Sequence, residues 1–150
     1  ETVDLLPLAQ EAAENLRAAA EAKNVSIIVS GENAPVTGVR RLLYEIAYNL
    51  CDNAIKYNVD GGSVDVRVGA EGGSACLTVR DTGIGIPPEH QSRIFERFYR
   101  VDKSHSKASG GTGLGLSIVK HAVAYHHGTI ALKSEVGKGT EIAVRFPQEK

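Results

Sequence analysis

Residues 39–80, VRRLLYEIAYNLCDNAIKYNVDGGSVDVRVGAEGGSACLTVR, contain one helical pattern followed by two strand patterns. Apolar residues recur three and four positions apart over 39–57, which predicts a long amphipathic helix. Those residues are Leu42, Leu43, Ile46, Leu50 and Ala54. Over 63–69 valines alternate with polar residues, and 75–80 repeats the alternation after a glycine pair. This stretch therefore predicts a long helix that leads into a β-hairpin.

The flanking sequence adds elements of both kinds. Further helices are predicted at 8–23, 91–98 and 113–125, and further strands at 25–30, around Val36, at 129–134 and at 140–146. Helices that precede and interrupt hairpins favour an α+β fold, a two-layer sandwich with helices packed on one face of a mixed β-sheet. A chain of 150 residues is expected to form one domain, 1–150.

The charge balance argues against two kinds of partner. Lysine and arginine total 17 against 18 for aspartate and glutamate, so the net charge of −1 gives no long-range attraction for nucleic acid or an anionic membrane. No apolar run approaches the ~18 residues of a membrane helix. Cys51 and Cys76 lack C-x-x-C spacing and are interpreted as small buried hydrophobes. The chain starts without Met, and we expect an excised domain with no nucleic-acid partner and no direct membrane contact.

The first candidate site is NLCDNAIKY, residues 49–57, on the long helix. Spacings of four and three place Asn49, Asn53 and Lys56 on one face, with Tyr57 at its edge. Asparagine is a poor residue for a helix interior, so a function other than folding is indicated. Amide oxygens suit Mg²⁺, and a lysine suits phosphate. The alternative is an ordinary solvated helix face.

A second candidate, DTGIGIP at residues 81–87, directly follows a strand. Gly83 and Gly85 permit positive φ and a close approach of the backbone. A buried Asp81 would accept a hydrogen bond from the exocyclic amine of adenine, whereas guanine presents an acceptor there. The alternative is a plain Asp-x-Gly turn.

A third candidate, RIFERFYR, spans residues 93–100. Phe95 and Phe98 stand three apart, and we interpret them as packing residues rather than ligand contacts. The basic residues around them form a local cationic patch suited to a triphosphate: Arg97, Arg100, Lys103 and Lys107.

The fourth candidate, GGTGLGLS at residues 110–117, opens a predicted helix. Free N–H groups at a helix start, with glycines beside them, form a site for anions. The stretch matches neither G-x-G-x-x-G nor a P-loop, and a flexible hinge is the alternative.

Together, in this order and at these separations, the four stretches resemble the N box, first glycine box, F box and second glycine box of the sensor histidine kinase catalytic domain, which has the Bergerat ATP-binding fold. The opening VDLLPLAQEA and the closing VGKGTEIAVRFP also resemble that family. The similarity spans nearly the whole chain.

The resemblance implies a role for each matching position. The implied metal ligands are Asn49 and Asn53, and the implied catalytic residues are Asn49, Lys56 and Arg100. The positions implied to contact ATP are Asn53, Lys56, Tyr57, Asp81, Gly83, Gly85, Ile86, Arg100, Gly111, Thr112, Gly113, Leu114, Gly115 and Thr140. Residues 101–112 would form a lid over the nucleotide.

The implied activity is transfer of the γ-phosphate of Mg²⁺-bound ATP to a histidine on a separate dimerisation segment. Further implied partners are that phosphoacceptor segment and a response regulator, and the implied location is the cytoplasmic part of a membrane-anchored sensor. The chain itself is expected to be monomeric and to turn over little ATP. Its own histidines match no phosphoacceptor motif and are interpreted as surface or loop residues: His90, His105, His121, His126 and His127. His127 stands where the family commonly has glycine.

Three other functions stay open. A serine kinase of the same fold would phosphorylate a partner protein. A hydrolytic ATPase of the same fold would need an acidic base one turn before Asn53, where this chain has Asn49. A non-catalytic nucleotide-sensing module would keep binding without transfer.

Overall fold

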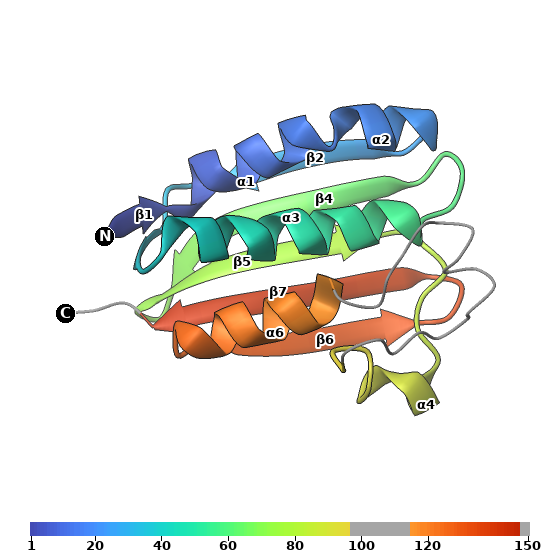
Figure 1. Ribbon diagram of the computed structural model, residues 1–150. Coiled ribbons are helices and arrows are strands. Elements are labelled where there is room, and N and C mark those ends of the chain that lie inside the picture. Colours follow the sequence, from blue (N-terminus) through green and yellow to red (C-terminus); the bar gives the residue numbers. More distant parts are fainter. Residues whose placement is uncertain (97–114, 148–150) are drawn as a thin grey trace.

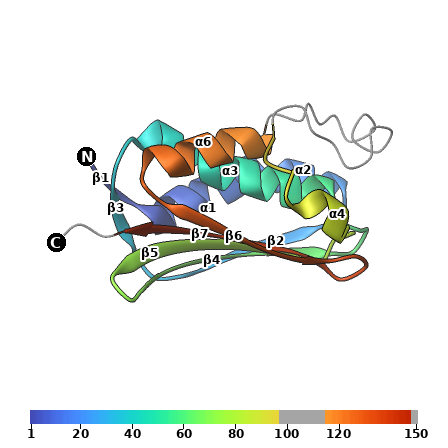
Figure 2. The same ribbon diagram turned by 90° about the horizontal axis from the view of Figure 1, so that it is seen from below.

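The structure is a computed structural model that describes residues 1–96 and 115–147. It has two layers. Helices cover one face of a β-sheet, and Figure 2 shows them together on the same side, while none of the described elements covers the opposite face (Figures 1 and 2). The predicted α+β sandwich is therefore confirmed.

Within the described residues the helices are α1 (Leu5–Asn15), α2 (Arg17–Ala22), α3 (Arg40–Lys56), α4 (Pro88–Gln91) and α6 (Gly115–Tyr125). The helices predicted at 39–57 and 113–125 from their strong helical periodicity agree closely with α3 and α6. The single helix predicted at 8–23 is instead divided at Leu16, where φ is −103° and ψ is 1°. These angles lie outside the α region, so α1 and α2 follow each other with a break.

The short helix predicted at 91–98 was wrong in position. The chain is helical over α4 and turns through residues 92–95, while residues 97 and 98 lie outside the described part. Pro88 explains the earlier start, because the first turn of a helix tolerates a residue without an N–H.

Seven strands appear in the described residues, and five of them form the main sheet. They are β1 (Thr2–Asp4), β2 (Ser26–Gly31), β3 (Pro35–Thr37), β4 (Ser63–Glu71), β5 (Ser74–Asp81), β6 (Thr129–Glu135) and β7 (Gly139–Pro147). The main sheet has the order β2-β4-β5-β7-β6, with β2 parallel to β4 and the other pairs antiparallel. β1 pairs with β3 as a separate antiparallel ribbon. The mixed sheet is as predicted, whereas β1 was missed because three residues carry too little alternation to recognise.

The core lies between α1, α3 and α6 and the covered face of the sheet. From the predicted apolar stripe of α3, the fully buried members are Leu43, Ile46, Leu50 and Ala54, and Leu42 packs at the edge of the core. The strands contribute every second residue, such as Val64, Val66 and Val68 on β4. Burial of these side chains is the main stabilising term for the sandwich.

The same alternation corrects one prediction about cysteine. Cys51 on α3 is fully buried, as expected, but Cys76 on β5 is partly exposed. Its neighbours Ala75 and Leu77 point into the core, so Cys76 points to the uncovered face of the sheet. The error arose because an apolar residue in a strand was assumed to face inward.

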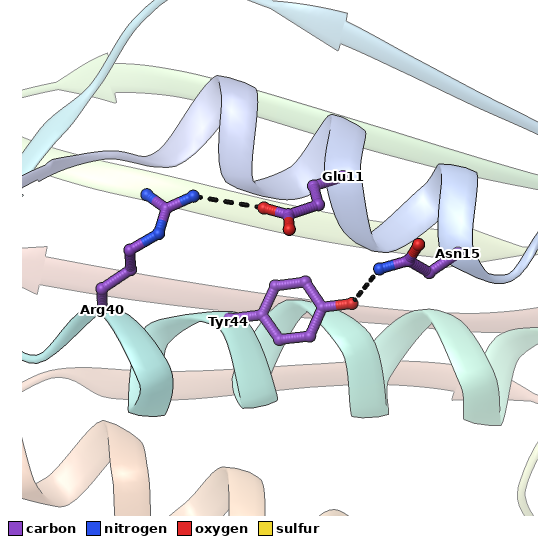
Figure 3. A network of polar contacts seen from close by, with 4 residues as sticks. All are labelled: Glu11, Asn15, Arg40 and Tyr44. Carbon is purple, nitrogen blue, oxygen red and sulfur yellow. Dashed lines mark hydrogen bonds and ion pairs between the residues drawn. The ribbon is translucent and has the colours of Figure 1, made fainter.

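Polar contacts on the outer surface align α1 with α3. Arg40 Nη2 donates to Glu11 Oε2 at 3.1 Å, and Asn15 Nδ2 donates to the hydroxyl of Tyr44 at 2.7 Å (Figure 3). These pairs are exposed and add little energy each. They span about a turn of both helices, so they set the register in which the two helices lie side by side.

Candidate functional site

The end of the asparagine-bearing helix α3 and the DTGIGIP loop lie at one edge of the sandwich, beside the β6–β7 turn. In Figure 1 the end of α3, the end of β5, α4 and the β6–β7 turn all lie toward the right-hand side. Asp81, the last residue of β5, is the cross-strand partner of Thr140 near the start of β7. The sheet register thus places two predicted site residues next to each other.

Asp81 is held by backbone amides from two directions. Its Oδ1 accepts the N–H of Gly83 at 2.8 Å and the N–H of Thr140 at 3.2 Å. Burial raises the pKa of Asp81 to about 6, while the hydrogen bonds from Gly83 and Thr140 act in the lowering direction. The carboxylate is therefore fixed in orientation at a partly buried position, as a specific acceptor requires.

Asn49 points toward the first turn of α6. Its Nδ2 donates to the carbonyl oxygen of Glu45 at 2.8 Å, so Oδ1 is turned away from its own helix. A Cβ atom built on Gly115 would lie 3.2 Å from that Oδ1. Because the amide nitrogen is turned toward the carbonyl of Glu45, the amide oxygen is the end that lies toward the start of α6.

Lys56 carries a charge near the end of α3 and is paired within its own helix. Its Nζ lies 3.0 Å from Asp52 Oδ2, and both side chains are partly buried. An ammonium has three donors, so one ion pair leaves capacity for another anion. Asp52 was not predicted as a site residue, although the i, i+4 spacing to Lys56 is visible in the sequence.

The loop after β5 is tied to the end of α3 and to β6. The N–H of Ile84 donates to the carbonyl of Tyr57 at 3.1 Å, and the N–H of Ile86 donates to Ser134 Oγ at 2.8 Å. Gly85 has φ of +76°, and a Cβ there would lie 2.2 Å from the carbonyl oxygen of Glu135. Glycine is required at this position both by conformation and by space.

Known proteins match this arrangement along the whole chain. Residues 38–150 match the family described as histidine kinase-, DNA gyrase B- and HSP90-like ATPases. The chain belongs to this family.

Its relatives within the family are sensor histidine kinases. The sensor-like histidine kinase SenX3 of Mycolicibacterium smegmatis is 40% identical over 149 residues, which are 99% of this chain and 39% of the relative. The solved structure of the mycobacterial sensor histidine kinase MprB superposes with a TM-score of 0.85 at 32% identity, covering 98% of this chain and 96% of that one. The histidine kinase ShkA, solved at full length with AMPPNP, gives a TM-score of 0.80 at 29% identity and is matched over 30% of its chain. The chain is thus a catalytic ATP-binding domain of the sensor histidine kinase type, and it spans about two-fifths of SenX3.

In this kinase domain, a second group of polar residues supports the site and was not predicted. Ser134 Oγ donates to the carbonyl of Gly139 at 3.0 Å and lies 2.8 Å from the hydroxyl of Thr140. Gln91 Nε2 donates to the carbonyl of Ile86 at 2.8 Å and to that of Ser134 at 3.2 Å. These bonds connect α4, the loop after β5 and the β6–β7 turn. They depend on strand register, which the motif spacing does not reveal.

Several other predicted site residues lie outside the described part of the kinase domain. They are Arg100, Gly111, Thr112, Gly113 and Leu114, together with Arg97, Lys103 and Lys107 of the predicted cationic patch. Gly115, at the first position of α6, is the described member of the second glycine box that belongs to the predicted site.

The histidines correct another prediction. His121 and His127 are exposed, but His126 is buried, with 8% of its surface exposed. Its Nδ1 lies 2.8 Å from the carbonyl of Ala122, and its Nε2 accepts the N–H of Val39 at 3.1 Å. The carbonyl can only accept, so the ring is neutral with its proton on Nδ1. His126 therefore caps the start of α3, about 25 Å from the Lys56 end at 1.5 Å per residue.

His127 follows at a turn where the backbone is left-handed, with φ of +59°. Glycine adopts this conformation more readily than any other residue, which agrees with the glycine that the resemblance implies at this position. A small pocket of about 180 Å³ lies beside it and is lined by Val36, Thr37, Gly38, Tyr125, His126, His127 and Pro147. That pocket is at the opposite end of α3 from Asp81 and holds none of the predicted site residues.

Within residues 1–96 and 115–147, no helix combines the length and apolar character needed to cross a membrane. The same part of the chain holds no group of three histidine, cysteine, aspartate or glutamate side chains that would suit a transition metal. The candidate ligands Asn49 and Asn53 are neutral amides. Two such oxygens fit Mg²⁺, which retains waters and shares substrate phosphates.

Proposed function

We propose that this kinase domain binds Mg²⁺-ATP and donates the γ-phosphate to a histidine on a separate phosphoacceptor segment of its parent protein. The observation that carries the proposal is the fixed, partly buried Asp81 carboxylate beside the end of the asparagine-bearing helix α3. Similarity to ShkA, which was solved with AMPPNP, supports a bound adenine nucleotide.

Asp81 and the residues around it recognise adenine in this proposal. Oδ1 accepts the two backbone N–H groups, so Oδ2 is the acceptor for the exocyclic amine of adenine. Tyr57 lies against the base, and Thr140 closes the sheet side. Gly83, Gly85 and Ile86 form the adjoining wall, where the absence of a side chain at the two glycines brings the backbone close. Guanine would set its carbonyl oxygen against the carboxylate and is rejected.

The polar face of α3 and the second glycine box bind the triphosphate and the metal in this proposal. Asn49 and Asn53 offer amide oxygens to the metal, and Lys56 offers a point charge to the phosphates. The metal, when bound, neutralises charge that develops on the phosphate oxygens. Arg100 and residues 111–115 are proposed phosphate contacts by resemblance, with the N–H groups at the start of α6 acting as anion donors.

The reaction needs no general base from this domain. A neutral imidazole nitrogen of the acceptor attacks the γ-phosphorus, the bond to the bridging oxygen breaks, and ADP leaves. The proton on the other ring nitrogen of the acceptor then passes to solvent or to a group of the phosphoacceptor segment. The domain positions the nucleotide and keeps water from being activated. Asn49 stands where the hydrolytic class has an acid, and it cannot remove a proton from water. Glu45, one turn earlier, forms an ion pair with Arg41, in which Glu45 Oε1 lies 3.2 Å from Arg41 Nη1.

The resemblance extends the proposal to the parent protein. We propose a membrane-anchored sensor with this domain on its cytoplasmic side, a dimerisation segment that carries the acceptor histidine, and a response regulator that receives the phosphate. The 150-residue domain is expected to be monomeric, because the family dimerises through the other segment.

Isothermal titration of the 150-residue domain with Mg²⁺-ATP and with Mg²⁺-GTP tests the proposal. ATP should bind and GTP should not. Equal affinity for the two nucleotides, or no binding of ATP, would contradict it. For the parent protein, acid-labile phosphate on the acceptor supports histidine transfer, whereas acid-stable phosphate would show a serine kinase.

A further inference from the structure

A buried amide joins the end of α3 to the loop that carries Asp81. Asn58 is one of few buried polar residues in the described chain, with 4% of its surface exposed. It follows Tyr57 directly, and its own N–H donates to the carbonyl of Ile55 at 3.2 Å. A buried amide must have partners, so the direction of its bonds shows what it holds together.

Asn58 makes three side-chain hydrogen bonds. Its Nδ2 donates to the carbonyl of Ser63 at 2.9 Å. Its Oδ1 accepts the N–H of Val59 at 2.8 Å and the hydroxyl of Thr82 at 3.3 Å. The bond to Val59 is a local turn contact, but the other two reach the start of β4 and the residue after Asp81.

Ser63 and Thr82 complete a closed ring with Asn58. The hydroxyl of Thr82 accepts the N–H of Ser63 at 2.9 Å, and the N–H of Thr82 donates to the carbonyl of Ser63 at 3.2 Å. The ring continues the β4–β5 pairing beyond the strand pair Val64 and Asp81. It therefore fixes Thr82, and with it the neighbouring Asp81, relative to the end of α3.

Two glycines make this close contact possible. A Cβ on Gly62 would lie 2.1 Å from Asn58 Oδ1, and a Cβ on Gly83 would lie 2.3 Å from the carbonyl oxygen of Tyr57. Both distances are far below van der Waals contact. The backbone of the Asp81 loop and the turn after α3 are thus packed directly against each other, with the Asn58 amide at the junction.

We propose that Asn58 is a positioning residue for adenine selection. Through Thr82 it sets the distance between the Asp81 carboxylate and the end of α3, where Tyr57 and Lys56 hold the other parts of the nucleotide. A carboxylate selects a donor only when its oxygen lies within hydrogen-bond reach, and an error of an ångström removes that selection. This inference rests on the proposed binding of ATP by Asp81.

Variants at both ends of the Asn58–Thr82 bond test the inference. Thr82→Val keeps the branched shape at an exposed position and removes the hydroxyl, whereas Thr82→Ser keeps the hydroxyl and is the matched control. Asn58→Asp keeps Oδ1 but sets a second oxygen against the carbonyl of Ser63. The probes are Mg²⁺-ATP and Mg²⁺-ITP, which differ in that ITP carries a carbonyl in place of the amine.

The readout is the ratio of the two dissociation constants for each folded variant. We expect the ATP preference of the original domain to fall at least fivefold in Thr82→Val and Asn58→Asp, and to be retained in Thr82→Ser. The double variant should be no worse than the more affected single one, because both break the same connection.

The outcomes separate the inference from the function on which it rests. If the original domain shows no preference for ATP over ITP, the proposed function fails. In a second outcome, the domain prefers ATP, and folded Thr82→Val keeps that preference and shows only a lower melting temperature. In that case Asn58 contributes to stability alone, and the inference is wrong. Thr82→Val distinguishes these outcomes even if Asn58→Asp does not fold.

Discussion

Asp81 on β5 accepts a hydrogen bond from the backbone N–H of Thr140 on the adjacent strand β7 at 3.2 Å, between residues that are cross-strand partners. A carboxylate at the end of a strand usually depends on its own loop for orientation. Here the neighbouring strand supplies one of the two amides, so the sheet itself fixes the side chain. The position of the carboxylate is therefore as rigid as the sheet register.

Asp81→Asn should sharply weaken adenine binding without unfolding the domain. The asparagine oxygen can still accept the N–H groups of Gly83 and Thr140, but its amide nitrogen then faces the adenine amine, and two donors meet. We expect affinity for ATP to fall at least 100-fold, since an unpaired buried polar group costs about 1–3 kcal/mol on each side. Calorimetry measures the loss, and Asp65→Asn on the uncovered face of the sheet is the matched control.

The raised pKa of Asp81 makes stability and binding depend on pH in opposite directions. Burial lifts this pKa from 3.8 to about 6, so between these values the folded state binds a proton that the unfolded state has lost. The contribution of Asp81 to the free energy of unfolding therefore falls as pH rises through that window. Asp81→Asn should lack this component and should be at least as stable as the original domain at pH 7.

Binding should follow the ionised form of the same group. Adenosine affinity is expected to weaken as pH falls below about 6, because a protonated carboxyl offers a poorer acceptor. Adenosine is the suitable probe, since it has no phosphate that titrates in this range. An adenosine affinity that stays constant from pH 7 to pH 5 would contradict the role given to Asp81.

Lys56→Met should weaken ATP binding about tenfold and leave adenosine binding unchanged. The substitution keeps an unbranched apolar stem and removes the charge that we propose contacts the phosphates. Loss of the ion pair with Asp52 should change stability by only about 0.3–0.5 kcal/mol, as for other i, i+4 pairs. Parallel titrations with ATP and adenosine decide the outcome. Lys138→Met, at an exposed pair in the β6–β7 turn, is the control.

Asn49→Ala should reduce the dependence of ATP binding on magnesium. The amide oxygen that points toward Gly115 is lost, while the backbone of α3 gains a better helix former. We expect the ratio of ATP affinities with and without Mg²⁺ to shrink about tenfold and the melting temperature to stay equal or rise. A ratio equal to that of the original domain would show that Asn49 is not a ligand of the proposed metal.

His126→Ala should destabilise the domain by about 2 kcal/mol, because it leaves the N–H of Val39 without its acceptor. ATP affinity should change less than twofold, since the proposed site lies at the other end of α3. Urea unfolding measures the first effect and calorimetry the second. His121→Ala, an exposed position on α6, the helix that directly precedes His126, should show neither.

Sequence patterns were sufficient where periodicity was long or chemistry was unusual. The apolar stripe of α3 and the alternation in β4 and β5 fixed the layers, and the asparagines stood out because a helix disfavours them. Short elements carried too little signal, so β1 was missed and α4 was misplaced.

The supporting polar contacts were beyond sequence reasoning for a physical reason. His126 and Val39 are 87 positions apart, and Gln91 and Ser134 are 43 apart, so their pairing exists only once the sheet register is set. Asn58 directly follows the helix predicted at 39–57, and nothing in the pattern showed that its amide would be buried. Local motifs identify residues that touch a ligand more readily than residues that hold those residues in place.

The parallel pairing of β2 with β4 has a consequence for how the chain acquires its structure. β4–β5 and β6–β7 are hairpins with short turns, whereas β2 and β4 are separated by β3 and the whole of α3. Closing that long loop costs entropy before any pairing energy is gained. We therefore expect the hairpins to form early and the β2–β4 ladder to close late. Refolding should be slowed most by substitutions that weaken α3, which packs on the strands β4 and β5.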